Sequence, residues 1–138
     1  PPVTDCFALR FDHAAGSVVF SSDTAFFPPL ADFARGASIL VHEAMLAEGI
    51  ERLVARTGNG ERLREHLLAS HTFAAEAGRI ATEAGVGRLV LNHLIPADDP
   101  QISVADWERA ARETWSGPLT VAVDGLAVPL AEEKRERT

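Results

Sequence analysis

The sequence predicts an α/β fold, and two observations support this prediction. Two short and almost entirely apolar runs, residues 38–42 (SILVH) and 88–92 (RLVLN), are typical of strands that are covered on both faces. The segment between them has apolar residues at helical spacing, so strand, helix and strand alternate as in a parallel sheet. We expect one α/β unit over residues 1–130, followed by a charged tail at residues 131–138.

The first elements expected are a β-hairpin and a short helix. Residues 6–11 and 17–20 are β-prone and flank a turn at residues 12–16 that has a glycine at its end. A proline pair then precedes residues 30–35, and Gly36 follows them, which predicts a helix with a proline start and a glycine stop.

Three helices are expected between the two buried strands. Apolar residues recur at helical spacing over residues 43–56, and a second helix is expected at about residues 61–69. The third helix is expected over residues 73–84, with Thr72 as a candidate N-cap and Glu76 nearby as a capping acid. His71 consequently lies on the loop between the second and third helices.

The last elements expected are a helix and a hairpin. Residues 104–115 form an amphipathic helical pattern. Residues 119–123 and 126–130 are two β-prone runs about Asp124-Gly125, which predicts a terminal hairpin.

The composition narrows the classes of partner. The net charge of −7, from 20 acidic against 13 basic residues, disfavours long nucleic acids because their phosphates would be repelled. No apolar run approaches the roughly 18 to 20 residues of a membrane-spanning helix, and the N-terminus lacks a signal-peptide pattern. We therefore expect a cytoplasmic chain with no membrane partner.

The single cysteine, Cys6, restricts the metal chemistry that the chain could support. One thiol can form neither an internal disulfide nor a thiolate cage, so a metal would have to be held by histidine and carboxylate. Cys6 lies in an apolar run and is expected to pack there as a small hydrophobic residue.

Three polar residues follow the ends of β-runs, where α/β folds gather functional side chains: Asp23, His42 and His93. A carboxylate can bridge two cations and imidazole is a common zinc ligand, so Asp23 and His93 form a sensible but incomplete metal site. The alternatives are a turn or N-cap role for Asp23, a satisfied strand-end histidine at 93, and a capping or surface role for His71.

The remaining candidates have simpler interpretations. His42 is left without a role in chemistry and is expected to support the structure. His13 in a turn and His66 on a helix are expected to be solvated. Asp98 and Asp99 could contact a substrate, although acidic loops beside prolines are common.

Four segments resemble, in order, motifs of the metallo-β-lactamase-fold hydrolases. Residues 20–24 (FSSDT) resemble the "SGDT" segment, and residues 40–44 (LVHEA) resemble "LVHEAT". Residues 70–72 (SHT) stand in place of "HST", and residues 90–94 (VLNHL) resemble the closing "LxLxHL". The resemblance covers residues 6–130 and implies the C-terminal half of the four-layer αββα metallo-β-lactamase fold.

Within that family the chain looks most like the branch of ribonuclease Z, arylsulfatase and cyclic-nucleotide phosphodiesterase. Residues 89–100 and 117–126 are most similar to arylsulfatase-like members. The family also implies the cofactors, which would be two Zn²⁺ ions or other divalent metals in the intact enzyme.

The resemblance assigns four roles. Asp23 would bridge two metals and His93 would bind one of them. His71 would assist proton transfer to the leaving group, and Glu43 would orient it, because a carboxylate bonded to one ring nitrogen fixes the tautomer.

The departures from the family pattern are as informative as the matches. Ser22 replaces a glycine and Met45 a threonine, and residues 94–99 lack the arginine of the ribonuclease Z proteins, which weakens the tRNA-processing interpretation. The signature HxHxDH, which supplies most metal ligands in the family, occurs nowhere in the 138 residues.

The sequence therefore predicts half of a dinuclear metal-dependent hydrolase of small-molecule esters, inactive as this chain alone. Sulfate esters and phosphodiesters rank ahead of lactones and carboxylic esters. The alternative is a non-catalytic half-domain or interaction module that a partner chain completes, or that pairs as a homodimer through an exposed sheet. A truncated or proteolysed form of a longer protein is a third explanation of the missing half.

Overall fold

The computed structural model describes residues 5–130, so the charged tail expected at residues 131–138 lies outside the described part. The α/β prediction is confirmed by a five-stranded sheet in the order β1-β2-β3-β4-β5. Its strands are β1 (Leu9–His13), β2 (Gly16–Phe20), β3 (Ile39–Met45), β4 (Arg88–Ile95) and β5 (Leu119–Val121). β1 and β2 form the expected antiparallel hairpin, and β2 to β5 run parallel.

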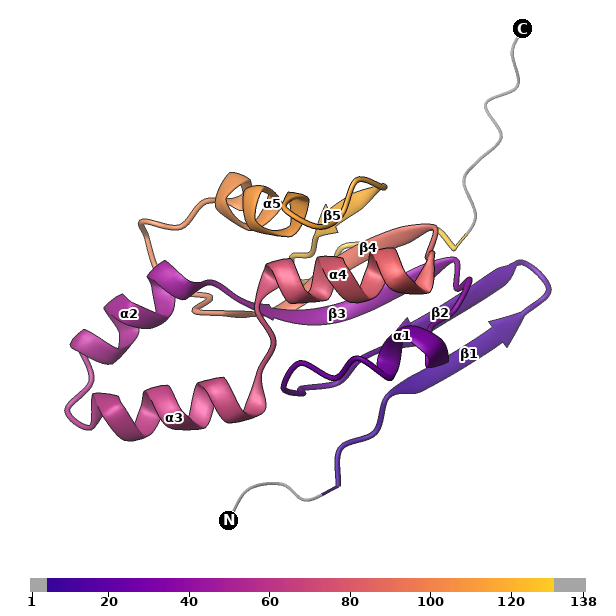
Figure 1. Ribbon diagram of the computed structural model, residues 1–138. Helices are drawn as coiled ribbons and strands as arrows, with labels where there is room; N and C mark the ends of the chain where they lie inside the picture. Colours follow the sequence, from indigo (N-terminus) through magenta and orange to yellow (C-terminus); the bar gives the residue numbers. More distant parts are fainter. Residues whose placement is uncertain (1–4, 131–138) are drawn as a thin grey trace, which may run out of the picture.

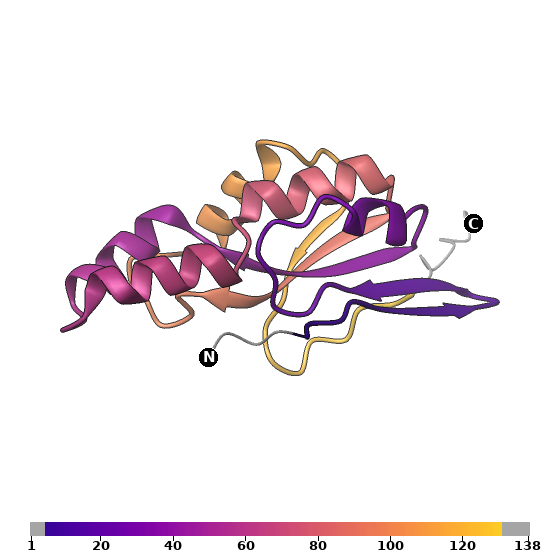
Figure 2. The ribbon, with the colours of Figure 1, turned by 60° about the horizontal axis from the view of Figure 1, so that its bottom comes forward.

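Five helices connect these strands in the described part. They are α1 (Leu30–Phe33), α2 (Ala47–Ala55), α3 (Gly60–Ser70), α4 (Ala74–Ala84) and α5 (Val104–Arg112). Figures 1 and 2 show that α1, α4 and α5 lie over one face of the sheet, while α2 and α3 form a pair that extends beyond its end.

The main core lies between the sheet and this helical layer. The register aligns Val19, Leu40, Leu89 and Leu119 across four strands, so they share the face that packs against α4 and its neighbours. The first three of them are fully buried. Burying such side chains contributes roughly 1.5 to 3 kcal/mol each, which holds the parallel strands in one register.

The opposite face of the sheet is partly open at the hairpin. Leu9, Phe11 and Phe20 remain substantially exposed there, with Phe11 at 57%. Phe11 and Phe20 contact each other edge to face with ring centroids 6.1 Å apart. The exposed apolar sheet surface predicted from the sequence is therefore present.

The predicted helix start at residue 43 is wrong. Residues 43–45 continue β3, where Glu43 pairs with Asn92 and Met45 with Ile95. They are buried between neighbouring elements, and the helix begins only at Ala47. Three residues are too few to show a helical period, so strand pairing decided the conformation of residues 43–45.

The predicted N-cap at Thr72 is also wrong. The N-cap of α4 is Phe73, whose N–H donates to Glu76 Oε2 at 3.0 Å. The Thr72 hydroxyl instead donates to the carbonyl oxygen of Thr24 at 2.6 Å. Glu76 therefore caps the helix as expected, but the N-cap residue that it contacts is Phe73, one residue later than predicted.

The predicted terminal hairpin is not formed. β5 pairs in parallel with β4, and residues 126–130 form no strand. After the turn at Gly125 the chain passes across the open face of the sheet towards β2, as Figure 2 shows, and Leu130 lies beside Gly16. α5 also ends at Arg112, three residues before the predicted end.

Candidate functional site

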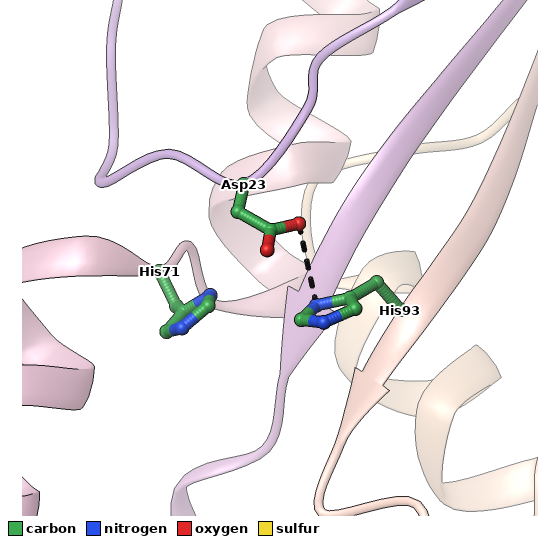
Figure 3. Close-up of side chains that lie close together, drawn as sticks. All are labelled: Asp23, His71 and His93. Carbon is green, nitrogen blue, oxygen red and sulfur yellow. Dashed lines mark ion pairs between the residues drawn. The ribbon is translucent and has the colours of Figure 1, made fainter. Parts of the chain in front are cut away.

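Three side chains converge where the carboxyl ends of the central strands meet. Asp23 follows β2, His93 lies in β4, and His71 lies on the loop between α3 and α4 (Figure 3). One ligand atom from each of these residues lies within 4.8 Å of the others. Residues far apart in sequence thus form one group that could hold a metal.

The backbone at this group is unusual at two positions. His93 has a φ of 41° and lies at a β-bulge, where the β3–β4 register shifts. Beyond this bulge β4 continues past the predicted end at His93, as far as Ile95. Ser22, beside Asp23, has a φ of 55° and donates its hydroxyl hydrogen bond to the Phe7 carbonyl at 2.7 Å. Left-handed conformations in non-glycine residues cost energy and often accompany functional sites.

The donor atoms fit a divalent metal. Asp23 Oδ1 and His93 Nδ1 are 3.4 Å apart, and both side chains are about half exposed, at 54% and 50%. Two ligands about 2.1 Å from one tetrahedral zinc lie about 3.4 Å apart, so both atoms could bind the same ion without moving. Carboxylate and imidazole are also the donors that zinc accepts in the absence of thiolates.

His71 is held by a buried carboxylate. Glu43, only 1% exposed, places Oε1 at 3.1 Å from His71 Nδ1. The same oxygen accepts a 3.0 Å hydrogen bond from the Thr24 N–H. With Nδ1 engaged, Nε2 is the ring nitrogen of His71 that remains for a metal or a substrate.

Burial sets the protonation of this pair. It raises the pKa of Glu43 to about 8, opposed by the hydrogen bond from Thr24, while the charge of Asp23 raises it further. Burial lowers the pKa of His71. The negative charge of Asp23 acts in the opposite direction, because it favours the imidazolium form. Glu43 Oε2 is buried and has no hydrogen-bond partner among the described residues, so no hydrogen bond at this oxygen stabilises the charged form.

Two further hydrogen bonds fix Glu43 and the Asp23 loop. The Glu43 N–H donates to Ser21 Oγ at 3.2 Å, and Thr72 Oγ1 bonds the carbonyl of Thr24. Thr72 is fully buried and adjoins His71, so it ties the loop of Asp23 to the loop of His71. The sequence contains a threonine in each loop but no local signal of this contact.

His42 stays outside the group. It is buried, and its Nδ1 lies 2.7 Å from the carbonyl oxygen of Glu43, to which it donates in the neutral form. Burial lowers its pKa to about 4. The expectation of a supporting role therefore agrees with the structure.

Asp98 and Asp99 form ion pairs with helix α2. Asp99 lies 2.7 Å from Arg52, and Asp98 lies 3.0 Å from Arg56. The hydrogen bond from the Gln101 N–H, followed by that from Arg52, lowers the pKa of Asp99. These contacts give both aspartates a role in holding the loop after β4.

The other two histidines are exposed, as predicted. His13 Nδ1 accepts from the Ala15 N–H at 3.1 Å within the hairpin turn. His66 lies with its ring centroid 6.3 Å from that of His71. His66 lies on α3 and His71 directly follows that helix, so their closeness reflects their nearness in sequence.

The prediction for Cys6 is wrong. The residue is exposed, because β1 begins only at Leu9, and its thiol donates to the carbonyl of Asp23 at 2.7 Å. It thereby contacts the backbone of the loop that carries Asp23 rather than the core.

A pocket that the sequence did not predict adjoins His93. Its volume is about 710 Å³, and it lies between the loop after β4, helix α5 and the segment after β5. Its walls come from segments far apart in sequence, so no local pattern could reveal it.

Comparison with known proteins gives sequence relatives and a solved structure. No protein-family model matches the chain. It is 36% identical over 113 residues to ribonuclease Z of Myxococcus xanthus, covering 82% of the chain and 32% of that protein. It is 30% identical over 126 residues to the probable metallo-hydrolase YhfI of Bacillus subtilis, covering 91% of the chain and 43% of that protein.

The solved structure agrees with these relatives. The crystal structure of the metallo-β-lactamase fold protein YhfI from Bacillus subtilis matches with a TM-score of 0.66 and 30% identity, over 91% of this chain and 44% of that one. The chain thus spans about a third to a half of the length of these relatives.

These findings confirm the fold and the family resemblance at a coarse level. The chain is related to ribonuclease Z and YhfI and shares the metallo-β-lactamase fold with YhfI. The similarity to arylsulfatase-like members stays a prediction. The expectation that nucleic acids are disfavoured is opposed by the relatives, because several are named as ribonucleases. No helix among residues 5–130 is long and apolar enough to cross a membrane.

Proposed function

We propose that this relative of ribonuclease Z and YhfI supplies the C-terminal half of the site of a dinuclear metal-dependent hydrolase. The observation that carries the proposal is the group of Asp23, His71 and His93, whose ligand atoms lie within 4.8 Å of one another. A turn aspartate and two surface histidines would have no reason to converge from three separate segments.

The donor set divides into metal-binding and proton-transferring residues. Asp23 and His93 would hold the metals. Because Glu43 occupies His71 Nδ1, a protonated His71 could give the proton on Nε2 to the departing oxygen of an ester. Two divalent ions would polarise the ester and supply a hydroxide nucleophile near neutral pH.

The substrate class follows from this chemistry and from the relatives. Phosphodiesters and sulfate esters come first, and lactones and carboxylic esters follow. The name ribonuclease Z describes enzymes that act on RNA, so RNA phosphodiesters belong among the substrates to be tested. The net charge of −7 then requires that positive charge come from elsewhere in the complete protein.

The remaining ligands would come from outside these 138 residues. An HxHxDH segment, on another part of the protein or on a partner chain, would face Asp23 and His93. The exposed side chains of Leu9, Phe11 and Phe20 on the open sheet face fit a second layer packed against them. The chain alone is therefore expected to be inactive.

Metal binding by the chain provides the first test. Isothermal titration with Zn²⁺ of a protein that carries this chain together with an HxHxDH segment should detect binding that is lost in Asp23→Ala, whereas tight binding of two metals by the 138-residue chain alone would contradict the half-site. Asp32→Ala is the matched control, because Asp32 is an exposed aspartate of helix α1 that pairs with Arg35. Equal binding by wild type and Asp23→Ala would refute the metal assignment.

Hydrolysis provides the second test. A protein that carries this chain together with an HxHxDH segment should be assayed on an aryl sulfate, a bis-aryl phosphate, a cyclic nucleotide, a lactone and an RNA. Activity should disappear in Asp23→Ala and survive in Asp32→Ala. Activity unchanged by Asp23→Ala would instead favour the alternative, an interaction module that associates through its open sheet face.

A further inference from the structure

The pocket beside His93 has the shape of a binding site for a small organic group. It is a hollow of about 710 Å³ that is open to solvent on one side, with a volume within the range of small-molecule pockets. The residues that line it are His93, Leu94, Pro96, Ala97, Asp99, Ile102, Trp107, Ala122, Val123 and Asp124. Trp107 is buried, so its indole ring belongs to a fixed wall rather than to a mobile surface.

The lining selects against negative charge. Most of it is apolar, and none of the described residues that line it is Lys or Arg. Asp99 is neutralised by Arg52 at 2.7 Å, whereas Asp124 is exposed and its charge is unopposed by any residue of the lining. An uncharged apolar group should therefore enter more easily than an anion of the same shape.

The pocket is placed to one side of the metal-binding group. His93 belongs to both, whereas His71 does not line the pocket. The rings of His71 and His93 stack with centroids 5.6 Å apart and an interplanar angle of 22°. His93 thus separates the pocket from the residue assigned to the leaving group.

We propose that this pocket binds an apolar, uncharged organic group that stays on the reacting centre while the leaving group departs on the side of His71. The proposal rests on the proposed hydrolytic function. It implies a preference for esters with organic groups on both sides of the reacting centre. A sulfate monoester carries only the leaving group and would leave the pocket empty.

The binding test uses the 138-residue chain with no metal, in the presence of a chelator. 2-Naphthol is the uncharged probe, and naphthalene-2-sulfonate is an anion of similar shape. In amide NMR spectra the naphthol should shift signals of residues 93–107 and 122–124. The sulfonate should bind at least about tenfold more weakly, which corresponds to a modest electrostatic penalty.

Matched variants locate the binding. Ala97→Trp places a large side chain in the pocket and should weaken naphthol binding at least about tenfold, because the apolar contact area is lost. Ala127→Trp is the control, since Ala127 is another exposed loop alanine that does not line the pocket, and it should bind naphthol as wild type does. Asp124→Lys should strengthen sulfonate binding.

The outcomes separate the two proposals. Shifts outside the pocket, equal binding of the two probes, or no effect of Ala97→Trp would each overturn the pocket assignment. Asp32→Ala should bind naphthol normally, because Asp32 is exposed on helix α1 and does not line the pocket. Normal probe binding, combined with hydrolysis that is unchanged by Asp23→Ala in a protein that also carries an HxHxDH segment, would overturn the proposed hydrolase mechanism and leave the pocket assignment standing.

Discussion

The candidate site has a buried half and an exposed half that differ in how they are held. Glu43 and Thr72 are 1% and 0% exposed, and hydrogen bonds from separate segments fix both of them. Asp23 and His93 leave about half of each side chain in solvent and approach each other at 3.4 Å. The buried half positions the site, and under the proposed function the exposed half would offer ligand atoms to an ion and face a second protein segment.

The two halves also differ in backbone strain. Glu43 lies in β3 and has no left-handed φ, whereas His93 has one and Asp23 follows Ser22, which has one too. Strain at the ligands and rigidity beneath them indicate that stability and chemistry are carried by different residues. Four predictions test this division, from the largest expected effect to the smallest.

Removing a ligand from the exposed half should abolish metal binding and leave the fold intact. His93→Ala should weaken Zn²⁺ binding by more than about 100-fold, since first-shell ligands matter more than their supports. The unfolding free energy should change by less than about 0.5 kcal/mol, because the side chain is half exposed. Isothermal titration and urea unfolding measure the two effects.

The control for this variant is His13→Ala, which removes an exposed histidine from the hairpin turn and should change neither quantity. A large loss of stability in His93→Ala would mean that the exposed half also supports the fold.

The buried histidine should make stability depend on pH. The pKa of His42 falls from 6.5 to about 4 in the folded chain. The unfolded chain therefore takes up a proton first, so the contribution is fully present above pH 6.5 and is lost as pH falls towards 4. The loss should amount to about 3 kcal/mol.

The measurement compares urea unfolding of wild type and His42→Asn across this range. The asparagine amide can replace the donor to the Glu43 carbonyl but does not titrate. The raised pKa of Glu43 has the opposite effect, because stability is lost as pH rises from 4.5 to 8. Both proteins contain Glu43, so its contribution cancels when the stability of His42→Asn is subtracted from that of wild type. His13→Asn is the exposed control, and parallel curves for His42→Asn and wild type would contradict the prediction.

The clamp between the two loops should contribute measurably to stability. Thr72→Val keeps the shape but removes the hydrogen bond to the Thr24 carbonyl, which should cost about 1 to 2 kcal/mol. It should also weaken Zn²⁺ binding severalfold, because the loop of Asp23 loses its attachment.

Thr57→Val makes the same change in an exposed threonine, whose hydroxyl bonds the Leu53 carbonyl at 2.7 Å at the end of α2. It should cost less than about 0.5 kcal/mol and leave metal binding unchanged. Equal effects of the two variants would show that burial of the clamp is unimportant.

The smallest effect concerns the strained residue beside Asp23. Ser22→Gly loses the bond to Phe7 but relieves the left-handed φ, whereas Ser22→Ala loses the bond and keeps the strain. The glycine variant should be more stable than the alanine variant by about 1 kcal/mol in thermal unfolding.

At Ser116 the same pair of substitutions should have the reverse order. This serine is exposed and has no left-handed φ, so glycine there only adds freedom to the unfolded chain. Alanine more stable than glycine at both positions would show that Ser22 is not strained.

Local patterns predicted much of the fold. The apolar runs that became β3 and β4 were identified from the sequence pattern, and the turn before β2 was also correct, whereas α1 ends at Phe33 and not at residue 35 as predicted. The errors lie where a residue's neighbours come from elsewhere. Residues 43–45 were assigned to a helix because nothing local revealed their pairing with β4.

The sequence by itself determined which residues could do chemistry, because Asp23, Glu43, His71 and His93 stand in motifs of characteristic order. Only the tertiary structure decided that three of them share one small volume, that Thr72 clamps their loops, and that a pocket opens beside His93. The physical reason is that side-chain identity is a local property of the chain. Distances between residues 23, 71 and 93 depend instead on strand register, a bulge and the packing of loops, which no local pattern encodes.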